Sequence, residues 1–540
     1  MNFRLQTKIG AMLACLTVMS AGLSGGALCA AADDASSTTF TDNTLTYTKV
    51  YGGVEISDCD KSVSSLIIPK EVDGFPIVGI ADEAFLNCGG LTSLKIEADL
   101  TSIGNYAFSG CSGIKEIKFP DSLEHIGDCA FYYCTQLQKI ALGENLSEVG
   151  EYAFGYCLSL EDVTFSDEIK TLSKGMFYFD ISLDELELPK KLESIGAQCF
   201  MGCEMLGDVT IPATLKELQP TAFLSCTDIQ KFHVEDGNPI FSEGADGALL
   251  SEEGKTLAIY PAGNGVTECI LPEGIVSIEP YAFEGSLTLT TVTLPQSFTG
   301  NTLPEGAFSD CISLVSVSCD KSALSVIKPS LFAGCKSLKA LELPEDCSGI
   351  GDYAFYDCVG LTEMSIPESV EYLGAYSFFG CDNLNELTVP DDIRVIGDYA
   401  VGFTEPVDEE SEELLLRENF VLHGNSMGVA KKYANTTGVK FKATNFNFAL
   451  LYAALGSLAA LVVILMLLTF FLKKKKNASA KETATPEEVY DENYESILDD
   501  SDEDGDPFDR SYGFSIDNED EEDAEEEADT DDTDDSTEEA

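Results

Sequence analysis

AFSGCSGIKEIKFPDSLEHIGDCAFYYC, residues 107–134, contains two copies of one short pattern, Ala-Phe-x-x-Cys, placed 23 residues apart. Aligned on the phenylalanine, the same spacing holds without exception from Phe85 to Phe223, and the series resumes at Phe283 after an insertion, with spacings of 25, 24, 23 and 23 residues. A fixed period of this length predicts a solenoid in which each repeat forms one coil. The series consists of Phe85, Phe108, Phe131, Phe154, Phe177, Phe200, Phe223, Phe283, Phe308, Phe332, Phe355 and Phe378, with Val401 as a degenerate last copy.

The repeat consensus is I-G-x-x-A-F-x-x-C-x-x-L-x-x-L-x-[I/L]-P-x-x-[V/L]-x-x, and each segment has a structural role. At 114–120 the last apolar residues alternate with a polar one, which predicts a half-buried strand closed by proline. A second short extended piece follows at 123–127, and its glycine marks the bend into the next Ala-Phe-x-x-Cys. Because no coil can bury its apolar residues alone, stacked coils are expected to share one continuous core.

The charge of the chain excludes one class of partner. The 540 residues include 94 Asp and Glu against 32 Lys and Arg, a balance that repels nucleic acid. The excess is uneven, since residues 477–540 alone carry 29 acidic and two basic side chains. That composition is typical of a disordered, acidic tail.

Two apolar segments predict the membrane topology. Residues 1–32 have a basic start, an apolar run and small residues at the end, as in a secretory signal peptide. Residues 446–472 are long and apolar enough to span a bilayer. Lys473–Lys476 follow at once, and the positive-inside rule places them in the cytoplasm. The repeats are therefore expected outside the cell membrane, and the tail, residues 473–540, inside.

The sequence offers no recognisable catalytic constellation. Its three histidines, His125, His233 and His423, are far apart, and Cys-x-x-Cys does not occur. Phosphate-loop, dinucleotide and nucleophile-elbow motifs are absent as well. The segment beginning at Asp500 opens like a calcium loop, but Ser511 stands where the twelfth-position glutamate belongs. We therefore expect no enzyme activity, no cofactor and no metal.

The outward-pointing strand positions form the candidate binding face, because extended solenoid surfaces commonly bind partners. The alternative is that these side chains are ordinary solvated positions. The insertion at 232–263 is a second candidate, expected to protrude as a hairpin around Glu253-Gly254. The candidate binding residues are Lys95, Lys118, Thr164, Glu187, Thr210, His233, Thr293, Glu342, Ser365 and Thr388.

Ten repeats carry a cysteine three residues after the phenylalanine, which predicts a structural ladder through the stack. Neighbouring thiols would lie within reach of a strained disulfide, so pairing stays open. Asp180 and Ser286 replace cysteine in two repeats, which favours small side chains that hydrogen-bond the adjacent bend, as buried thiols also can. The ladder cysteines are Cys88, Cys111, Cys134, Cys157, Cys203, Cys226, Cys311, Cys335, Cys358 and Cys381.

The period, A-F-x-x-C and L-x-x-L-x-[I/L]-P together resemble the BspA-like (Treponema-type) leucine-rich repeats of bacterial and protist surface proteins. The resemblance covers residues 45–443 and implies a β-rich solenoid, a right-handed array of about 23-residue coils, with a terminal cap over 419–443. The acidic loop at 404–413 departs from the family pattern. The expected domains are a signal peptide (1–32), an N-terminal linker and cap (33–84), the solenoid (85–403, insert 232–263), an acidic loop and C-terminal cap (404–445), a transmembrane helix (446–472) and an acidic disordered cytoplasmic tail (473–540).

These features predict a single-pass cell-surface protein that binds other macromolecules, as in adhesion or contact with a host or another cell. Its expected ligand is an extracellular protein or glycan. The alternative is a receptor-like or regulatory membrane protein acting through its acidic tail on a cytoplasmic partner.

Overall fold

The computed structural model describes residues 39–42, 44–406, 414–444 and 448–479. The predicted signal peptide and most of the acidic tail lie outside these residues. The chain divides into two units, Met1–Phe448 and Ala449–Ala540, and each is considered by itself.

The N-terminal cap consists of strands that close the first end of the stack. Three antiparallel strands, β1 (Thr39–Thr41), β2 (Leu45–Val50) and β3 (Gly53–Cys59), follow one another. β3 then pairs in parallel with β6 (Phe75–Ile80), to which β5 (Glu71–Val72) adds as an antiparallel partner. The region expected as linker and cap is therefore folded from its first described residues.

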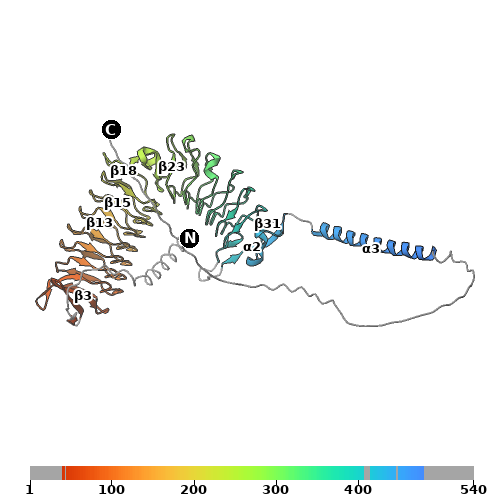
Figure 1. Cartoon of the computed structure of the whole chain (residues 1–540). Helices are drawn as coiled ribbons and strands as arrows, with labels where there is room; N and C mark the ends of the chain where they lie inside the picture. Colours follow the sequence, from red (N-terminus) through yellow and green to blue (C-terminus); the bar gives the residue numbers. More distant parts are fainter. Residues whose placement is uncertain (1–38, 43, 407–413, 445–447, 480–540) are drawn as a thin grey trace, which may run out of the picture. The chain divides into compact units, whose positions relative to one another are not determined.

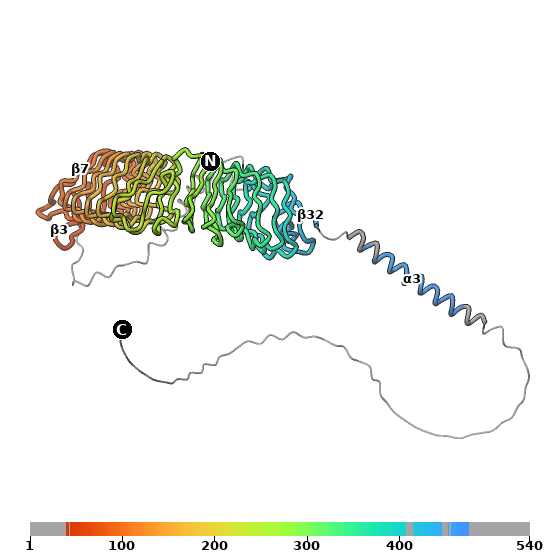
Figure 2. The backbone as a smooth tube through the Cα atoms, turned by 90° about the horizontal axis from the view of Figure 1, so that it is seen from above, coloured from red at the N-terminus to blue at the C-terminus, as the bar shows by residue number. Residues whose placement is uncertain are grey.

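The coils stack in parallel, and most of them contribute to two rows of strands (Figure 1, Figure 2). The pairing follows the 23-residue period, as between β9, β11 and β13, where Ile117, Ile140 and Val163 are partners. The predicted alternation is present, since Ile140 is buried between two exposed residues. The first row contains β4 (Ser65–Ile68), β7 (Ser93–Ile96), β9 (Glu116–Lys118), β11 (Lys139–Ala141), β13 (Asp162–Thr164), β16 (Val209–Ile211), β18 (Phe232–Val234), β22 (Glu268–Ile270), β24 (Thr291–Thr293), β25 (Ser316–Ser318) and β27 (Glu386–Thr388).

The second row consists of two-residue strands that correspond to the predicted second extended piece. Glycine follows six of these nine strands and allows close approach between coils: a Cβ atom added to Gly127 would lie 2.6 Å from the backbone nitrogen of Asn105. This row contains β8 (Ser102–Ile103), β10 (His125–Ile126), β12 (Glu148–Val149), β14 (Thr171–Leu172), β15 (Ser194–Ile195), β17 (Glu217–Leu218), β23 (Ser277–Ile278), β26 (Tyr372–Leu373) and β28 (Val395–Ile396). Short 3-10 turns lie at η1 (Ala245–Gly247), η2 (Glu252–Gly254), η3 (Gln296–Phe298) and η4 (Lys321–Leu324).

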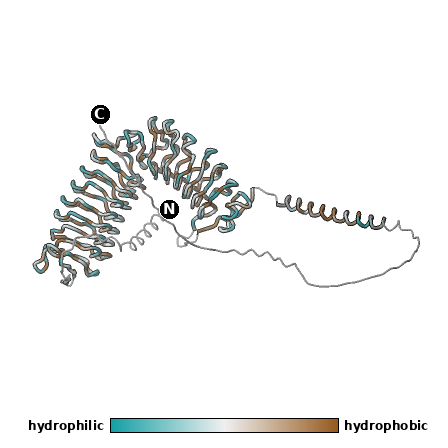
Figure 3. Tube along the Cα trace, in the orientation of Figure 1, coloured by the Kyte–Doolittle hydropathy of each residue, from teal (hydrophilic) through white to brown (hydrophobic). Residues whose placement is uncertain are grey.

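The phenylalanines form a stacked column inside the coils. Phe85 and Phe108 stack with ring centroids 4.7 Å apart, and the spacing reaches 5.9 Å between Phe154 and Phe177. All four rings are fully buried. Figure 3 shows hydrophobic segments along the inner course of the coils and hydrophilic ones at their outer edges. The prediction of a repeating buried core is confirmed.

The bend that carries each phenylalanine is held by hydrogen bonds between coils. Around Phe108, the N–H groups of Tyr106, Phe108 and Gly110 donate to carbonyl oxygens of the next coil at 2.7–2.8 Å. Tyr106 and Gly110 both have a left-handed backbone, with φ of 55° and 75°. This geometry turns alternate N–H groups toward the next coil, and glycine adopts it at low cost.

The insertion joins two hydrophobic cores. Its hairpin strands β20 (Leu249–Ser251) and β21 (Thr256–Ile259) are antiparallel around Glu253-Gly254, as predicted, and β19 (Ser242–Glu243) adds a third strand. Leu249 packs in the core of the preceding coils, whereas Leu257 packs in the core of the following coils. β21 also pairs in parallel with β23, so the hairpin is built into the second strand row instead of protruding as a whole.

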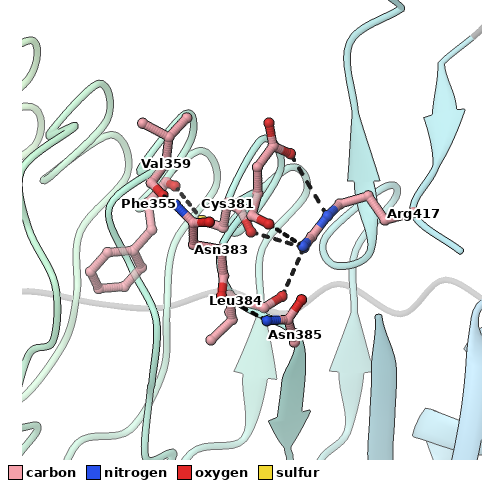
Figure 4. A network of polar contacts seen from close by, with 8 residues as sticks. Phe355, Val359, Cys381, Asn383, Leu384, Asn385 and Arg417 are labelled. Carbon is pink, nitrogen blue, oxygen red and sulfur yellow. Dashed lines mark hydrogen bonds and ion pairs between the residues drawn. The ribbon is translucent and has the colours of Figure 1, made fainter. Parts of the chain in front are cut away.

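At the far end, a short antiparallel pair, β29 (Phe403–Thr404) and β30 (Leu415–Leu416), flanks the acidic loop. Residues 407–413 of that loop lie outside the described part of the chain. Arg417 follows the pair and donates from its guanidinium to the carbonyl oxygens of Cys381 and Leu384, each at 2.8 Å (Figure 4). It also donates to the Asp382 carbonyl oxygen. Arg417 therefore fastens the chain after the loop to the last cysteine coil.

The C-terminal cap has the three elements predicted over 419–443. They are β31 (Val421–Gly424), α2 (Val429–Thr437) and β32 (Lys440–Ala443). β31 continues the first strand row by pairing with β27, and β32 pairs with β31. The parallel stack thus extends through the cap.

The second unit contains one long helix, α3 (Phe448–Ser479). Within it, Leu455–Lys474 is long and apolar enough to cross a membrane. The helix runs further than the predicted span and includes the four lysines, consistent with the good helix propensity of lysine. It is a candidate membrane-spanning helix.

Candidate binding surface

The outward row is the set of residues, one in each coil, that lie along the first strand row at the position two before the consensus proline. Adjacent members face each other through strand pairing: Lys118 pairs with Ala141, and Ala141 with Thr164. Thr210 likewise pairs with His233. The pairing therefore sets these side chains side by side on one surface, in the register that the 23-residue period predicts.

All ten predicted members of the outward row reach solvent. His233 and Thr293 are half-buried, and the other eight are exposed. Their role in binding remains a prediction. The exposed members are Lys95, Lys118, Thr164, Glu187, Thr210, Glu342, Ser365 and Thr388.

Three members of the outward row lie outside strands, contrary to the expected strand at each position. Glu187, Glu342 and Ser365 are in segments with no assigned strand. Their coils are held at the bends instead, as where the Phe355 N–H donates to the carbonyl oxygen of Ser377 at 2.8 Å. The coil register is kept there although the strand ladder lapses.

The structure adds residues to the outward row that the sequence prediction omitted. Ala141 and Ser318 were omitted, although they pair in register with the predicted members Thr164 and Thr293. Ile270 was omitted although Pro272 follows at the consensus distance, which is the signal that could have found it. The cap continues the row, since His423 pairs with Thr388 in the strand register.

The charges along this surface are of both signs and are largely paired. Lys139 lies 3.4 Å from Asp162 in the next coil, with both side chains more than half exposed. At the insertion, His233 lies 3.6 Å from Glu243, and Lys231 lies 3.2 Å from the same carboxylate. The Val234 N–H bond and the nearby Lys231 lower the pKa of Glu243. The surface therefore presents mixed polar groups rather than a field of one sign.

Large apolar side chains also stand exposed on this surface. Ile270 is 71 % exposed at the end of β22, and Ile67 is 57 % exposed on β4. Ile67 pairs with Lys95, and Ile270 pairs with Thr293, so both belong to the outward row. Burying an exposed isoleucine against a partner removes apolar surface from water, which favours binding.

A recess of about 540 Å³ opens on the second strand row between β12 and β14. His125 and Glu148 lie on one side of it, and Lys170 and Thr171 on the other. In the described residues β12 and β14 are not paired with each other, although β12 pairs with β10 and β14 pairs with β15. The recess is therefore a local opening of the ladder.

Ser173 lies at this opening and differs from its counterparts in its hydrogen bond. In the preceding coil the Gly150 N–H donates to the carbonyl oxygen of Ile126 at 2.8 Å. At the equivalent position Ser173 bonds the Val149 carbonyl oxygen through its hydroxyl group. Gln219, also non-glycine at this position, keeps its N–H bond to the carbonyl oxygen of Ile195. Ser173 and Gln219 both carry a side chain at this position, so the open coil is distinguished by the serine hydroxyl bond to the Val149 carbonyl oxygen.

Aromatic side chains gather outside the main core on the bend side of the coils. Tyr133 stacks on Tyr156 at 4.7 Å, and Tyr156 stacks on Phe179 at 5.4 Å. Tyr133 is 43 % exposed at the end of this column. Stacking between rings on successive coils stabilises these bends beyond the area that they bury.

The cysteine ladder is built from thiol-to-carbonyl hydrogen bonds. Every ladder cysteine except Cys88 donates to the carbonyl oxygen of a phenylalanine in the preceding coil, as Cys134 does to Phe108 at 3.3 Å. The distances run from 3.0 Å for Cys358 to 3.4 Å for Cys157. All ten ladder cysteines are buried free thiols in the structure. The predicted hydrogen bond to the adjacent bend is present.

The two substituted rungs behave differently from each other. Asp180 is fully buried and accepts from the Cys157 N–H at 2.8 Å. Its second carboxyl oxygen has no hydrogen-bond partner among the described atoms, and burial raises its pKa well above the ordinary value. The Ser286 hydroxyl is buried and likewise lacks a partner in the described region, contrary to expectation.

Two further carboxyl groups are held at unusual pKa values near the insertion. Burial, assisted by the nearby Asp310 carboxylate, raises the pKa of Glu284 to about 7. Burial also raises the pKa of Asp310 to about 6; Lys336 opposes this shift, and Asp357 reinforces it. Glu284 accepts two hydrogen bonds from Ser225, so it serves as a structural link between coils.

Metal-ligand geometry is not present in the part of the chain that the structure describes. No group of three or more histidine, cysteine or acidic side chains is arranged there to hold an ion. The calcium-like segment beginning at Asp500 lies outside the described residues.

The fold and surface together define a leucine-rich-repeat solenoid of the kind that presents a repetitive strand face to a partner. The family model described as the BspA type leucine rich repeat region matches residues 78–183, 170–245, 262–358 and 301–407, more than half of the chain. The chain belongs to this family, as its repeat motifs predict.

Solved structures that are similar to this chain come from several bacteria. A leucine rich cell surface protein from Faecalibacterium prausnitzii is 27% identical, with a TM-score of 0.58 over 68% of this chain and 96% of that chain. A leucine-rich repeat protein from Bacteroides ovatus is 26% identical, with a TM-score of 0.40 over 66% and 99%. The pneumococcal vaccine antigen PcpA is 19% identical, with a TM-score of 0.48 over 76% and 99%. None of the curated proteins matches the chain.

Proposed function

We propose that this protein is a single-pass surface protein whose outward row binds macromolecular ligands in adhesion or in contact with a host or another cell. The observation that carries the proposal is the register of the outward row, in which pairs such as Ile67 and Lys95 hold exposed side chains side by side. Membership of the repeat family supports a binding role, and the similar Faecalibacterium structure is that of a leucine rich cell surface protein.

The membrane arrangement is part of the proposal. Residues 1–32 act as a signal peptide, and α3 anchors the chain through Leu455–Lys474. Lys473–Lys476 hold the C-terminal side in the cytoplasm, because lysines are retained on that side of a bilayer. The solenoid then faces outward and the acidic tail inward.

The ligand is expected to be an extracellular protein, with a glycan as the second option. Exposed Ile67 and Ile270 supply apolar contact area, and neighbouring lysines and carboxylates supply orientation. Charge pairs within the surface, such as Lys139 with Asp162, leave no single-sign field that would favour a polyanion.

The test uses the full chain in nanodiscs on immobilised fibronectin, collagen and mucin, and on intact epithelial cells. Saturable binding to at least one of these surfaces, above that of empty nanodiscs, is the expected result. Binding no greater than that of empty nanodiscs on all four surfaces would count against the proposal.

A truncation after Lys476 separates adhesion from the receptor-like alternative. Adhesion through the solenoid should survive removal of residues 477–540. If binding persists but a cellular response to the bound ligand disappears, the tail has the signalling role. If binding itself disappears, the solenoid is not the adhesive part.

A further inference from the structure

Two cysteines from different parts of the fold meet at the N-terminal end of the stack. The Sγ atom of Cys59 lies 2.9 Å from the Sγ atom of Cys88, and both residues are buried. Cys59 is the last residue of β3 in the cap, whereas Cys88 is the first rung of the cysteine ladder. The two are 29 residues apart and therefore fall outside the 23-residue period.

Cys88 differs from every other ladder cysteine in what its thiol contacts. The other nine donate to a phenylalanine carbonyl oxygen of the preceding coil, as Cys111 does to Phe85 at 3.2 Å. Phe85 is the first phenylalanine of the series, so the coil before Cys88 has no repeat phenylalanine to offer its carbonyl oxygen. The Cys59 sulfur occupies this place instead. The first rung is thus the one at which a thiol faces another thiol.

We propose that Cys59 and Cys88 form a disulfide bond that ties the N-terminal cap to the first coil. A disulfide has a sulfur–sulfur distance of about 2.05 Å, so the two atoms need to approach by about 0.9 Å. The other ladder thiols already have a backbone acceptor, and pairing them would break that hydrogen bond. The geometry therefore selects this pair over neighbouring rungs such as Cys88 and Cys111.

The chemistry is a thiol–disulfide exchange with a small-molecule or enzyme disulfide as the oxidant. The thiolate of one cysteine attacks the oxidant, forms a mixed disulfide and releases one thiolate. The second cysteine then displaces the remaining half, so two protein thiols become one disulfide while the oxidant is reduced to two thiols. Burial beside Cys88 raises the pKa of Cys59, so we expect exchange as the cap docks, before the sulfurs are enclosed.

The bond would stabilise the end of the solenoid. β3 joins the cap hairpin to the first coils through its pairing with β2 and β6. A cross-link at its last residue restricts the unfolded cap and prevents it from separating from the stack. The oxidising surroundings come from the proposed extracellular location. Oxidation of the purified chain, however, tests the pairing independently of location.

The direct test is peptide mapping of the full chain after equilibration with glutathione disulfide and blocking of free thiols with N-ethylmaleimide. The expected result is a peptide pair joining Cys59 to Cys88 that disappears on reduction. N-ethylmaleimide adducts on both residues, or a link from Cys88 to Cys111, would overturn the proposal. Neither result bears on ligand binding, so failure here is distinct from failure of the proposed function.

A second measurement compares variants by thermal unfolding. Reduction is expected to lower the midpoint of the oxidised wild-type chain by about 3 °C. The Cys59→Ser variant should show no such reductant effect. Cys319→Ser, which alters a half-buried cysteine outside the ladder, should retain it. An equal reductant effect in wild type and Cys59→Ser would contradict the pairing, and the mapping result stands even if Cys59→Ser folds poorly.

Discussion

The carboxylate of Glu284 accepts hydrogen bonds from the N–H group of Ser225 at 2.7 Å and from its hydroxyl group at 3.0 Å. Ser225 belongs to the last coil before the insertion, and Glu284 belongs to the first phenylalanine coil after it. The two residues are 59 positions apart. This contact links the two stacks across the inserted hairpin, where the hydrophobic core is divided.

The Glu284 link makes stability depend on pH near neutrality. The folded carboxyl keeps its proton up to a pKa of about 7, whereas its ordinary pKa is 4.5. The folded state therefore binds more protons between these values, and stability falls as the pH rises through this window. Between pH 5 and 8 we expect the free energy of unfolding of Glu284→Gln to fall by roughly 1–2 kcal/mol less than that of wild type, measured by urea unfolding.

Glu268→Gln is the control for that measurement, because Glu268 is exposed on β22. Its pH profile should follow wild type. A profile of Glu284→Gln that is indistinguishable from wild type would exclude Glu284 as the group responsible.

Replacing Asp180 with the consensus cysteine should stabilise the fold. Asp180 is buried with one oxygen unpartnered, and its raised pKa means that folding must retain a proton which the unfolded chain releases. Asp180→Cys is expected to raise the free energy of unfolding by about 1–3 kcal/mol at pH 7, and by more at higher pH. Ser286→Cys, at the other substituted rung, should show a smaller gain that does not vary with pH. A destabilised Asp180→Cys would show that the carboxyl is needed for its bond to Cys157.

The opening between β12 and β14 should close when Ser173 loses its hydroxyl group. In Ser173→Gly the backbone N–H can take the Val149 carbonyl oxygen, as Gly150 takes that of Ile126. We expect at least tenfold slower hydrogen exchange at the amides around Thr171. Gln219→Gly alters the same position in a coil that is already paired, so exchange there should change little. Unchanged exchange around Thr171 in Ser173→Gly would mean that the hydroxyl is not the cause.

Arg417 should contribute more to the free energy of unfolding than an ordinary surface arginine does. Its guanidinium donates to three carbonyl oxygens and is only 12 % exposed. Arg417→Ala is expected to cost about 2–4 kcal/mol, because charged donors to buried carbonyls are lost. Lysine should rescue little, since it lacks the planar fork.

Arg394→Ala provides the comparison. Arg394 forms a 2.8 Å ion pair with Glu371 but is 72 % exposed, so its loss should cost less than about 1 kcal/mol in the same unfolding measurement. Equal costs at the two positions would remove the special role of Arg417.

The periodic part of the fold could be predicted because every coil repeats the same physical requirement. The phenylalanine register, the strand alternation and the bend glycines all followed from spacing alone. The contacts that depend on a departure from the period could not. Cys59 lies off the 23-residue register, so its approach to Cys88 required the folded cap.

The sequence also did not predict where a side-chain hydroxyl group takes the place of a backbone N–H in a hydrogen bond. Ser173 and Gln219 are both non-glycine residues at one repeat position, yet the serine hydroxyl replaces the backbone bond and the glutamine does not. Arg417 follows an acidic loop that interrupts the last repeat, and its partners are 33–36 residues earlier. Only the stacked structure brings such groups together.

The most direct test of the proposed binding face is a matched pair of isoleucine and valine variants. Ile270→Asp places a charge at the most exposed apolar side chain of the outward row, and Val395→Asp does the same on the second strand row, where Val395 is 54 % exposed. Both chains are compared with wild type on the fibronectin, collagen, mucin or cell surface that binds wild type. The account predicts at least tenfold weaker binding for Ile270→Asp and wild-type binding for Val395→Asp. Equal binding by the two variants, or loss only in Val395→Asp, would contradict it.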